Sequence, residues 1–163
     1  MSRILTIESE EDLNTLRKVS TEVENLNEVK ELIISLKEKF NEDESSLGLA
    51  APQLGVNKRV FIMTNPLNNG TVITCINPKI IKEYKDKVAI YKEACLSLPD
   101  TYVLTRRYKM LKVSFTTEEG KRETKLLRDE YAVIFQHEYD HLDGIIITDK
   151  DLRKINDRER IKW

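Results

Sequence analysis

QHEYDHLDG, residues 136–144, contains both histidines of this 163-residue chain, four positions apart, with a glutamate directly after the first. Residues four apart in an α-helix are offset by only about 40° around the axis, so His137 and His141 project from one face and can hold the same metal ion. Glu138 lies about 100° round from His137, where its carboxylate can reach a water at that metal. This H-E-x-x-H pattern predicts a metal-dependent hydrolase with Glu138 as general base.

The third metal ligand cannot be a histidine, because the chain has only two. A catalytic metal needs three protein ligands and one open position. Cys95, at the end of a predicted strand, offers a rigidly held thiolate. Glu159 lies at a spacing that resembles that of thermolysin-like proteases, and would make the chain a zinc endopeptidase. A third alternative is a metal-binding module without catalysis, whose coordination would be closed. The other cysteine, Cys75, is expected to be a small buried hydrophobe.

Composition indicates one globular domain over residues 1–163. Apolar residues make up 40% and charged residues 34% of a chain without repeats or linkers. Lys plus Arg number 27 and Asp plus Glu 28, so the net charge of -1 predicts no nucleic-acid specificity. The sequence shows neither a long apolar stretch nor an apolar signal core, and two cysteines make a poor disulfide framework. We therefore expect a cytoplasmic protein with no membrane partner.

The hydrophobic pattern predicts an α+β fold with helices at both ends and strands between them. Residues 10–20 and 27–40 are expected to form helices, the second capped by Asn27. Asp129 and Gly144 are expected to bound a helix over residues 129–143 that carries both histidines. Residues 47–55 are expected to form a compact loop. Alternating or β-branched segments predict strands at 59–64, 71–81, 87–98, 109–117, 121–128 and 145–148.

Three blocks together resemble the peptide deformylase family: LGLAAPQLG at 47–55, EACLSLP at 93–99 and QHEYDHLDG at 136–144. They occur in the family's order and at its approximate spacing. The resemblance implies antiparallel β-sheets surrounding a central metal-binding helix, with an N-terminal helix pair. It also implies Cys95 as the third ligand and one divalent metal ion, Fe²⁺ in the first place, with Zn²⁺ or Ni²⁺ as substitutes.

The reaction that the resemblance implies is removal of the formyl group from the N-terminal methionine of newly synthesised polypeptides, with release of formate. Glu138 would take a proton from the attacking water and give one to the leaving amine. The Gln53 side-chain amide and the Leu96 backbone N–H, with the metal, would stabilise charge on the formyl oxygen. Expected partners are N-formyl-methionyl nascent peptides and, transiently, the ribosome, although the short tail after residue 144 argues against C-terminal docking.

Substrate recognition is expected to involve three further residues. Gly48 would let the loop backbone approach the substrate closely, where a side chain would not fit. Val133 and Ile134, one turn before His137, are expected to line an apolar pocket for the methionine side chain.

Supporting contacts around the metal ligands can be predicted as well. Ligand imidazoles usually donate their other N–H to a carboxylate or carbonyl, and Asp140 is a candidate acceptor. Glu93 with Arg107 resembles a buried ion pair that the family keeps near its cysteine. Ser46 and Ala94 stand where the family patterns have glycine. Because alanine fits a strand, we expect activity to be retained.

Overall fold

Two helices precede the first strand of the chain. The structure is a computed structural model that describes residues 2–68 and 70–155. The first helix, α1, spans Glu10–Leu16. The second, α2, spans Lys30–Asn41 and packs Ile33 and Leu36 into the interior, as its apolar spacing predicts.

The start of α2 differs from the prediction. A 3-10 turn at Leu26–Val29 precedes the helix, and Asn25 caps that turn. The Asn25 side chain accepts from the Asn27 N–H (2.9 Å), while the Glu28 carboxylate accepts from the Asn25 N–H (3.2 Å). Asn27 is therefore not the cap, because the reciprocal capping box begins two residues earlier.

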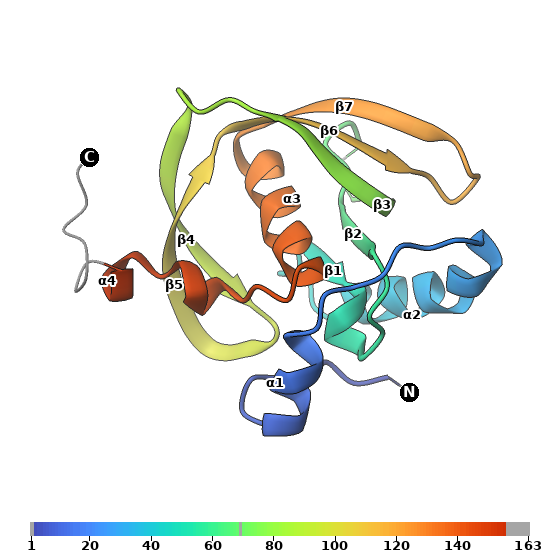
Figure 1. The fold of residues 1–163 in the computed structure, drawn as a ribbon, viewed down its shortest axis with the longest axis horizontal. Coiled ribbons are helices and arrows are strands. Elements are labelled where there is room, and N and C mark those ends of the chain that lie inside the picture. Colours follow the sequence, from blue (N-terminus) through green and yellow to red (C-terminus); the bar gives the residue numbers. More distant parts are fainter. Residues whose placement is uncertain (1, 69, 156–163) are drawn as a thin grey trace.

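The strands within the described residues form two antiparallel sheets around one helix (Figure 1). The larger sheet has the order β1-β2-β3-β6-β7 and the smaller one pairs β4 with β5. Their bounds are Gly48–Ala50 for β1, Val60–Thr64 for β2, Val72–Glu83 for β3, Val88–Cys95 for β4, Leu98–Tyr108 for β5, Met110–Thr116 for β6 and Arg122–Arg128 for β7.

Three segments were predicted wrongly. Strand β5 was missed, because Pro99 and Asp100 look like turn residues and only the long-range register with β4 reveals the strand. The expected loop at 47–55 contains β1, which is too short to show a period of two, followed by a 3-10 turn. Residues 147–150 form a 3-10 turn instead of a strand, and the Asp149 carboxylate accepts from the Ile146 N–H (3.0 Å) to close it.

The helix α3 spans Asp129–Leu142 and contacts strands of both sheets. Asp129 is its first residue rather than its cap, because β7 runs directly into the helix and the Asp129 N–H is already taken by the Lys109 carbonyl (2.8 Å). Gly144 follows the helix at a φ of 71°, as predicted. A Cβ at Gly144 would also lie 2.2 Å from the Arg17 carbonyl oxygen, so glycine is required there.

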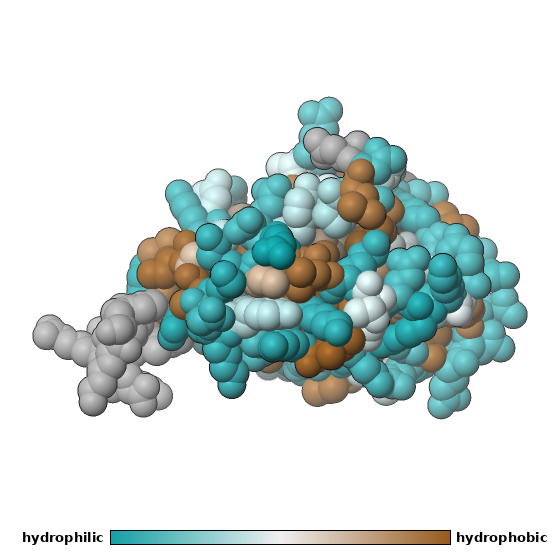
Figure 2. Space-filling view, turned by 90° about the horizontal axis from the view of Figure 1, so that it is seen from above, coloured by the Kyte–Doolittle hydropathy of each residue, from teal (hydrophilic) through white to brown (hydrophobic). Residues whose placement is uncertain are grey.

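The hydrophobic core lies on both faces of the larger sheet. One cluster, which includes Phe61, Cys75 and Phe135, fills the space between this sheet and α3. The other joins Val60 and Ile62 to α2 on the opposite face. Cys75 is fully buried in the first cluster, as predicted. Seen from above, the surface is mainly hydrophilic with separate small apolar patches (Figure 2). No helix within the described residues has the length and apolar character needed to cross a membrane.

Candidate active site

Three metal-ligating side chains meet where the end of β4 approaches α3. Cys95, the last residue of β4, faces His137 and His141 on α3, and the donor atoms of the three residues all lie within 4.8 Å of one another. Cys95 Sγ is 3.3 Å from His141 Nε2. The structure thus brings together the three predicted ligands, whereas the alternative ligand Glu159 lies outside the described residues.

The electrostatics of this cluster favour metal binding. Burial alone would raise the pKa of the Cys95 thiol, but His141 and His137 outweigh this and hold its pKa well below the ordinary value. A thiolate is the form of cysteine that binds a metal. His137 Nδ1 is 2.8 Å from the Glu93 carboxylate, which leaves His137 Nε2 for a metal. One thiolate and two imidazoles, with their donor atoms within 4.8 Å of one another, fit a divalent transition metal with an open position.

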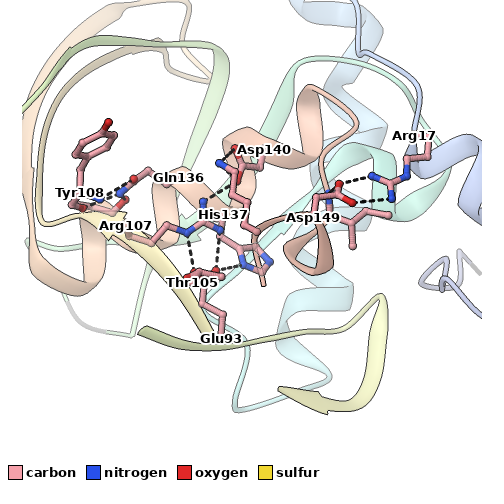
Figure 3. Close-up of polar contacts among 12 residues, drawn as sticks. Arg17, Glu93, Thr105, Arg107, Tyr108, Gln136, His137, Asp140 and Asp149 are labelled. Atoms are coloured by element: carbon pink, nitrogen blue, oxygen red, sulfur yellow. Dashed lines mark hydrogen bonds and ion pairs between the residues drawn. The ribbon is translucent and has the colours of Figure 1, made fainter. Parts of the chain in front are cut away.

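A buried ion network supports the first histidine (Figure 3). Glu93 accepts from Arg107 Nε (2.7 Å) and Nη2 (3.0 Å), and also from the Thr105 hydroxyl. Burial alone would raise the pKa of Glu93, but His137 and Arg107 hold that pKa well below its ordinary value. The predicted Glu93–Arg107 pair is confirmed, and its charged carboxylate orients the His137 ring.

Asp140 does not contact an imidazole, so this prediction was wrong. Its carboxylate binds Arg107 Nη1 (2.6 Å) and Lys150 Nζ (2.9 Å) instead. The helix turns Asp140 away from the ligand face and toward β5, where Arg107 lies between it and Glu93. Asp140 thus reaches His137 only through Arg107 and Glu93. Within the described residues, the His141 Nδ1 atom has no hydrogen-bond partner.

Glu138 lies beside the cluster and is only 4% exposed. Burial raises the pKa of its carboxyl to about 7, and its Oε2 atom has no partner among the described residues. Gly48 packs directly against this carboxylate, and a Cβ at position 48 would lie 2.7 Å from Glu138 Oε1. Gly48 is therefore needed to make room for Glu138, which is a different reason from the expected approach to substrate.

Gln53 is buried beside Cys95, and its side-chain amide contacts three groups around the ligand cluster. Its Oε1 accepts from the Ala50 N–H (3.0 Å), and its Nε2 lies 3.2 Å from Ser97 Oγ and 3.5 Å from Cys95 Sγ. The N-terminal segment holds both backbones in place, since Leu5 donates to the Gln53 carbonyl (2.8 Å) and Ile7 to the Ser97 carbonyl (3.0 Å). One amide hydrogen is thereby directed at Ser97 and the other at the ligand cluster.

The cluster lies at a cleft of about 980 Å³. Leu96, Val133 and Ile134 line this cleft beside Cys95 and Glu138, and so do Ser46 and Ala94, the two departures from the family patterns. Val133 and Ile134 are 7% and 8% exposed, and Ile134 also packs in the core. Apolar side chains that face both a core and a cleft suit the wall of a side-chain pocket.

Three residues of this site were not predicted from the sequence: Ser97, Thr105 and Lys150. Ser97 stands in the EACLSLP block two positions after Cys95, in the two-residue turn that joins β4 to β5. Thr105 lies on the same face of β5 as Val103 and Arg107. A correct prediction of that strand would therefore have placed Thr105 beside Arg107. No sequence signal indicates Lys150.

A thiolate and two imidazoles beside a buried glutamate, at the floor of an open cleft, define the class of metal-dependent hydrolases. A profile of the family described as Polypeptide deformylase matches residues 1–159. The chain therefore belongs to the peptide deformylase family, whose members remove the N-formyl group from the N-terminal methionine of nascent peptides.

Individual relatives agree with this assignment. The peptide deformylase of Thermotoga petrophila is 39% identical over 104 residues, which is 64% of this chain but only 61% of that relative. The crystal structure of peptide deformylase from Thermotoga maritima has a TM-score of 0.82 at 31% identity, covering 92% of this chain and 97% of that one. The Met-Ala-Ser-bound crystal structure of the class I type b enzyme from Acinetobacter baumannii has a TM-score of 0.79 at 29% identity, covering 92% and 99%.

Proposed function

We propose that residues 1–163 form a single catalytic domain that hydrolyses the formamide bond of N-formyl-methionyl peptides and releases formate. The observation that carries this proposal is the convergence of the Cys95, His137 and His141 donor atoms within 4.8 Å, beside the buried Glu138. In this proposal α3 is the central metal-binding helix, between the two sheets and behind the N-terminal helix pair.

The proposed cofactor is one divalent metal ion, Fe²⁺ in the first place, with Zn²⁺ or Ni²⁺ as substitutes. One sulfur and two nitrogen ligands suit all three ions. Such an ion, held by Cys95, His137 and His141, would supply Lewis-acid activation of water and of the formyl oxygen.

The residues of the chain would handle the proton and the developing charge. Glu138 is placed to accept a proton from the attacking water and to deliver one to the leaving amine. Burial of its carboxyl favours the protonated form, which helps a group that must both take and return a proton. The Gln53 amide and the Leu96 backbone N–H would donate to the formyl oxygen as it gains negative charge.

Substrate recognition would take place along the cleft. Val133 and Ile134 would contact the methionine side chain, and Gly48 would leave room for both Glu138 and the peptide. The tripeptide named in the Acinetobacter baumannii structure begins with methionine, which supports a peptide with this N-terminus as the ligand. Nascent polypeptides as substrates would place the protein in the cytoplasm, in transient contact with the ribosome.

Product analysis tests this function against the endopeptidase alternative. A formylated peptide of about ten residues, beginning with methionine, is incubated with metal-loaded chain and followed by mass spectrometry. We expect loss of the formyl group alone, with every peptide bond intact. Internal cleavage with the formyl group retained would instead support an endopeptidase. A metal-loaded chain that leaves the peptide unchanged would support a binding module.

Replacing Gly48 by alanine is expected to lower kcat by about 10²-fold, because the added methyl group displaces the Glu138 carboxylate. Metal content should stay unchanged. The effect is measured with formyl-Met-Ala-Ser in the wild-type and Glu138→Gln backgrounds. A further loss from Gly48→Ala in the Glu138→Gln background would show that the glycine acts through something other than Glu138.

Replacing Gln53 by leucine is expected to lower kcat and kcat/KM together by about 10²-fold, with KM nearly unchanged and metal content intact. An unchanged kcat would leave charge stabilisation to the metal and the Leu96 N–H.

Replacing Ser97 by alanine frees the Gln53 amide to rotate, so we expect kcat to fall by about tenfold. Ser97→Ala should cost nothing more in the Gln53→Leu chain, because the amide that it positions is then absent.

A further inference from the structure

Five cations share one face of the larger sheet, the face turned away from α3. Opposed residues of antiparallel strands point to the same side of a sheet, so the strand register defines this face. Lys79 lies opposite Ser114, Lys82 opposite Lys112, Leu126 opposite Lys112, Arg128 opposite Met110 and Arg122 opposite Thr116. We call Lys79, Lys82, Lys112, Arg122 and Arg128 the basic face; all five are exposed.

No carboxylate of the described residues stands among the cations along these strands, although Glu118 reaches the same face at Thr74 (2.7 Å), where it pairs with Lys37, and Asp86 and Asp129 lie at its edge beside Arg128. None of its paired positions on β3, β6 and β7, all within the described residues, is aspartate or glutamate. Within the described part of the chain, the Arg122 guanidinium bonds to neutral groups, including the Asn77 carbonyl (2.8 Å) and Ser114 Oγ (2.9 Å). Among residues 2–68 and 70–155, Lys79, Lys82 and Lys112 form no ion pair.

Lys82 and Lys112 are the most informative pair, because they face each other directly across β3 and β6. Like charges in this arrangement destabilise a sheet. A chain with 27 basic and 28 acidic residues could place a carboxylate opposite one of these lysines, and it places none there. The Lys82 ammonium lies over the Tyr84 ring (4.7 Å to the centroid), and an external anion over both ammonium groups would relieve the remaining repulsion. The near-zero net charge of the chain therefore conceals a local excess of positive charge.

We infer that the basic face binds the phosphate backbone of double-stranded RNA. Neighbouring strands are about 4.8 Å apart and alternate residues along a strand about 6.7 Å apart, which spreads the cations over two dimensions as a duplex surface requires. Duplex RNA is recognised mainly through its shape and its phosphates and 2′-hydroxyls. Lysine and arginine contacts to phosphate carry no sequence information, so the binding is independent of sequence.

The side chains between the cations favour duplex RNA over two other anionic partners. Single-stranded RNA is held by bases stacked on aromatic rings, but none of the paired positions of this face is aromatic, and the ring of Tyr84, just past β3, is covered by the Lys82 ammonium (4.7 Å to the centroid). A membrane surface is entered by several large apolar side chains, whereas Leu126 is the one exposed large apolar residue at these paired positions. Serine and threonine at the remaining positions suit phosphate and hydroxyl groups.

This inference rests on the proposed function for its biological setting, since nascent peptides emerge from a particle built largely of RNA. The basic face points away from α3, and α3 lines the catalytic cleft. RNA on this face would hold the chain near its substrates and leave the cleft open to them. Substitutions on the basic face should therefore leave the turnover of a free tripeptide unchanged.

Fluorescence anisotropy with a labelled RNA duplex of about 16 base pairs tests the inference. The variant Lys79→Gln/Lys82→Gln/Lys112→Gln is compared with Lys18→Gln/Lys30→Gln/Lys154→Gln, which removes three exposed lysines elsewhere and changes the net charge equally. Wild type and control should bind alike, with a Kd on the order of 10⁻⁵ M that weakens with salt. The face variant should bind at least about tenfold more weakly, with a salt slope shallower by roughly 3.

Melting temperature and formyl-Met-Ala-Ser turnover are measured on all three chains. Both should be unchanged, or the melting temperature of the face variant slightly raised, because the Lys82–Lys112 repulsion is gone. Equal RNA affinity for face variant and control, or no binding by the wild type, would overturn the inference. So would tighter binding to anionic phospholipid vesicles than to the duplex. Failure of tripeptide turnover in every chain would refute the proposed function. The comparison of RNA affinities would remain valid, because it is measured independently of turnover.

Discussion

Glu138→Gln is expected to lower kcat for formyl-Met-Ala-Ser by about 10²–10⁴-fold while the fold and metal content remain. Glutamine has nearly the same shape as glutamate but cannot take the proton of the attacking water. Glu138 is 4% exposed, and its Oε2 has no partner in the described part of the chain, so solvent is poorly placed to replace the carboxylate. Rates are measured with chains loaded to equal metal content, which separates the proton-transfer role from metal loss.

A smaller loss would have a definite meaning. If the kcat of Glu138→Gln fell by less than about tenfold, Glu138 would not be the general acid–base of the reaction. If the metal were lost together with the activity, Glu138 would instead be helping to hold the ion.

Cys95→Ala is expected to abolish both metal binding and activity, because two imidazoles are too few for a stable site. Cys75→Ala is the matched control, since it removes the other cysteine of the chain, which is buried in the core away from the ligands. That control should lose some stability but keep one metal per chain. Metal content is read by elemental analysis after gel filtration. Full metal occupancy in Cys95→Ala would exclude the proposed ligand set.

The site residues that could be predicted from the sequence are those marked by a short-range spacing or by a family motif. His137 and His141 follow from helical spacing alone, because a helix fixes which side chains share a face. Cys95 required the three family blocks, since no local spacing connects it with α3. The donor atoms meet only after the β4–β5 hairpin has packed against that helix.

The wrong predictions concern structure and contacts that are determined by residues far away in the sequence. Strand β5 carries turn residues near its start, and its pairing with β4 overrides them. Asp140 was assigned to an imidazole because it is near in sequence, but Arg107, 33 positions away, takes its carboxylate. Gly48 was identified from its motif, yet the atoms that exclude a side chain there belong to Glu138, which only the folded chain brings near.

Formate release from formyl-Met-Ala-Ser by a chain stripped with chelator and reloaded anaerobically with Fe²⁺ is the most direct test of the central claim. The claim is that Cys95, His137 and His141 hold one catalytic metal beside Glu138. We predict no formate from the stripped chain and activity that rises with added metal until one ion is bound per chain. Undiminished formate release after complete removal of the metal, or none at full loading, would contradict it.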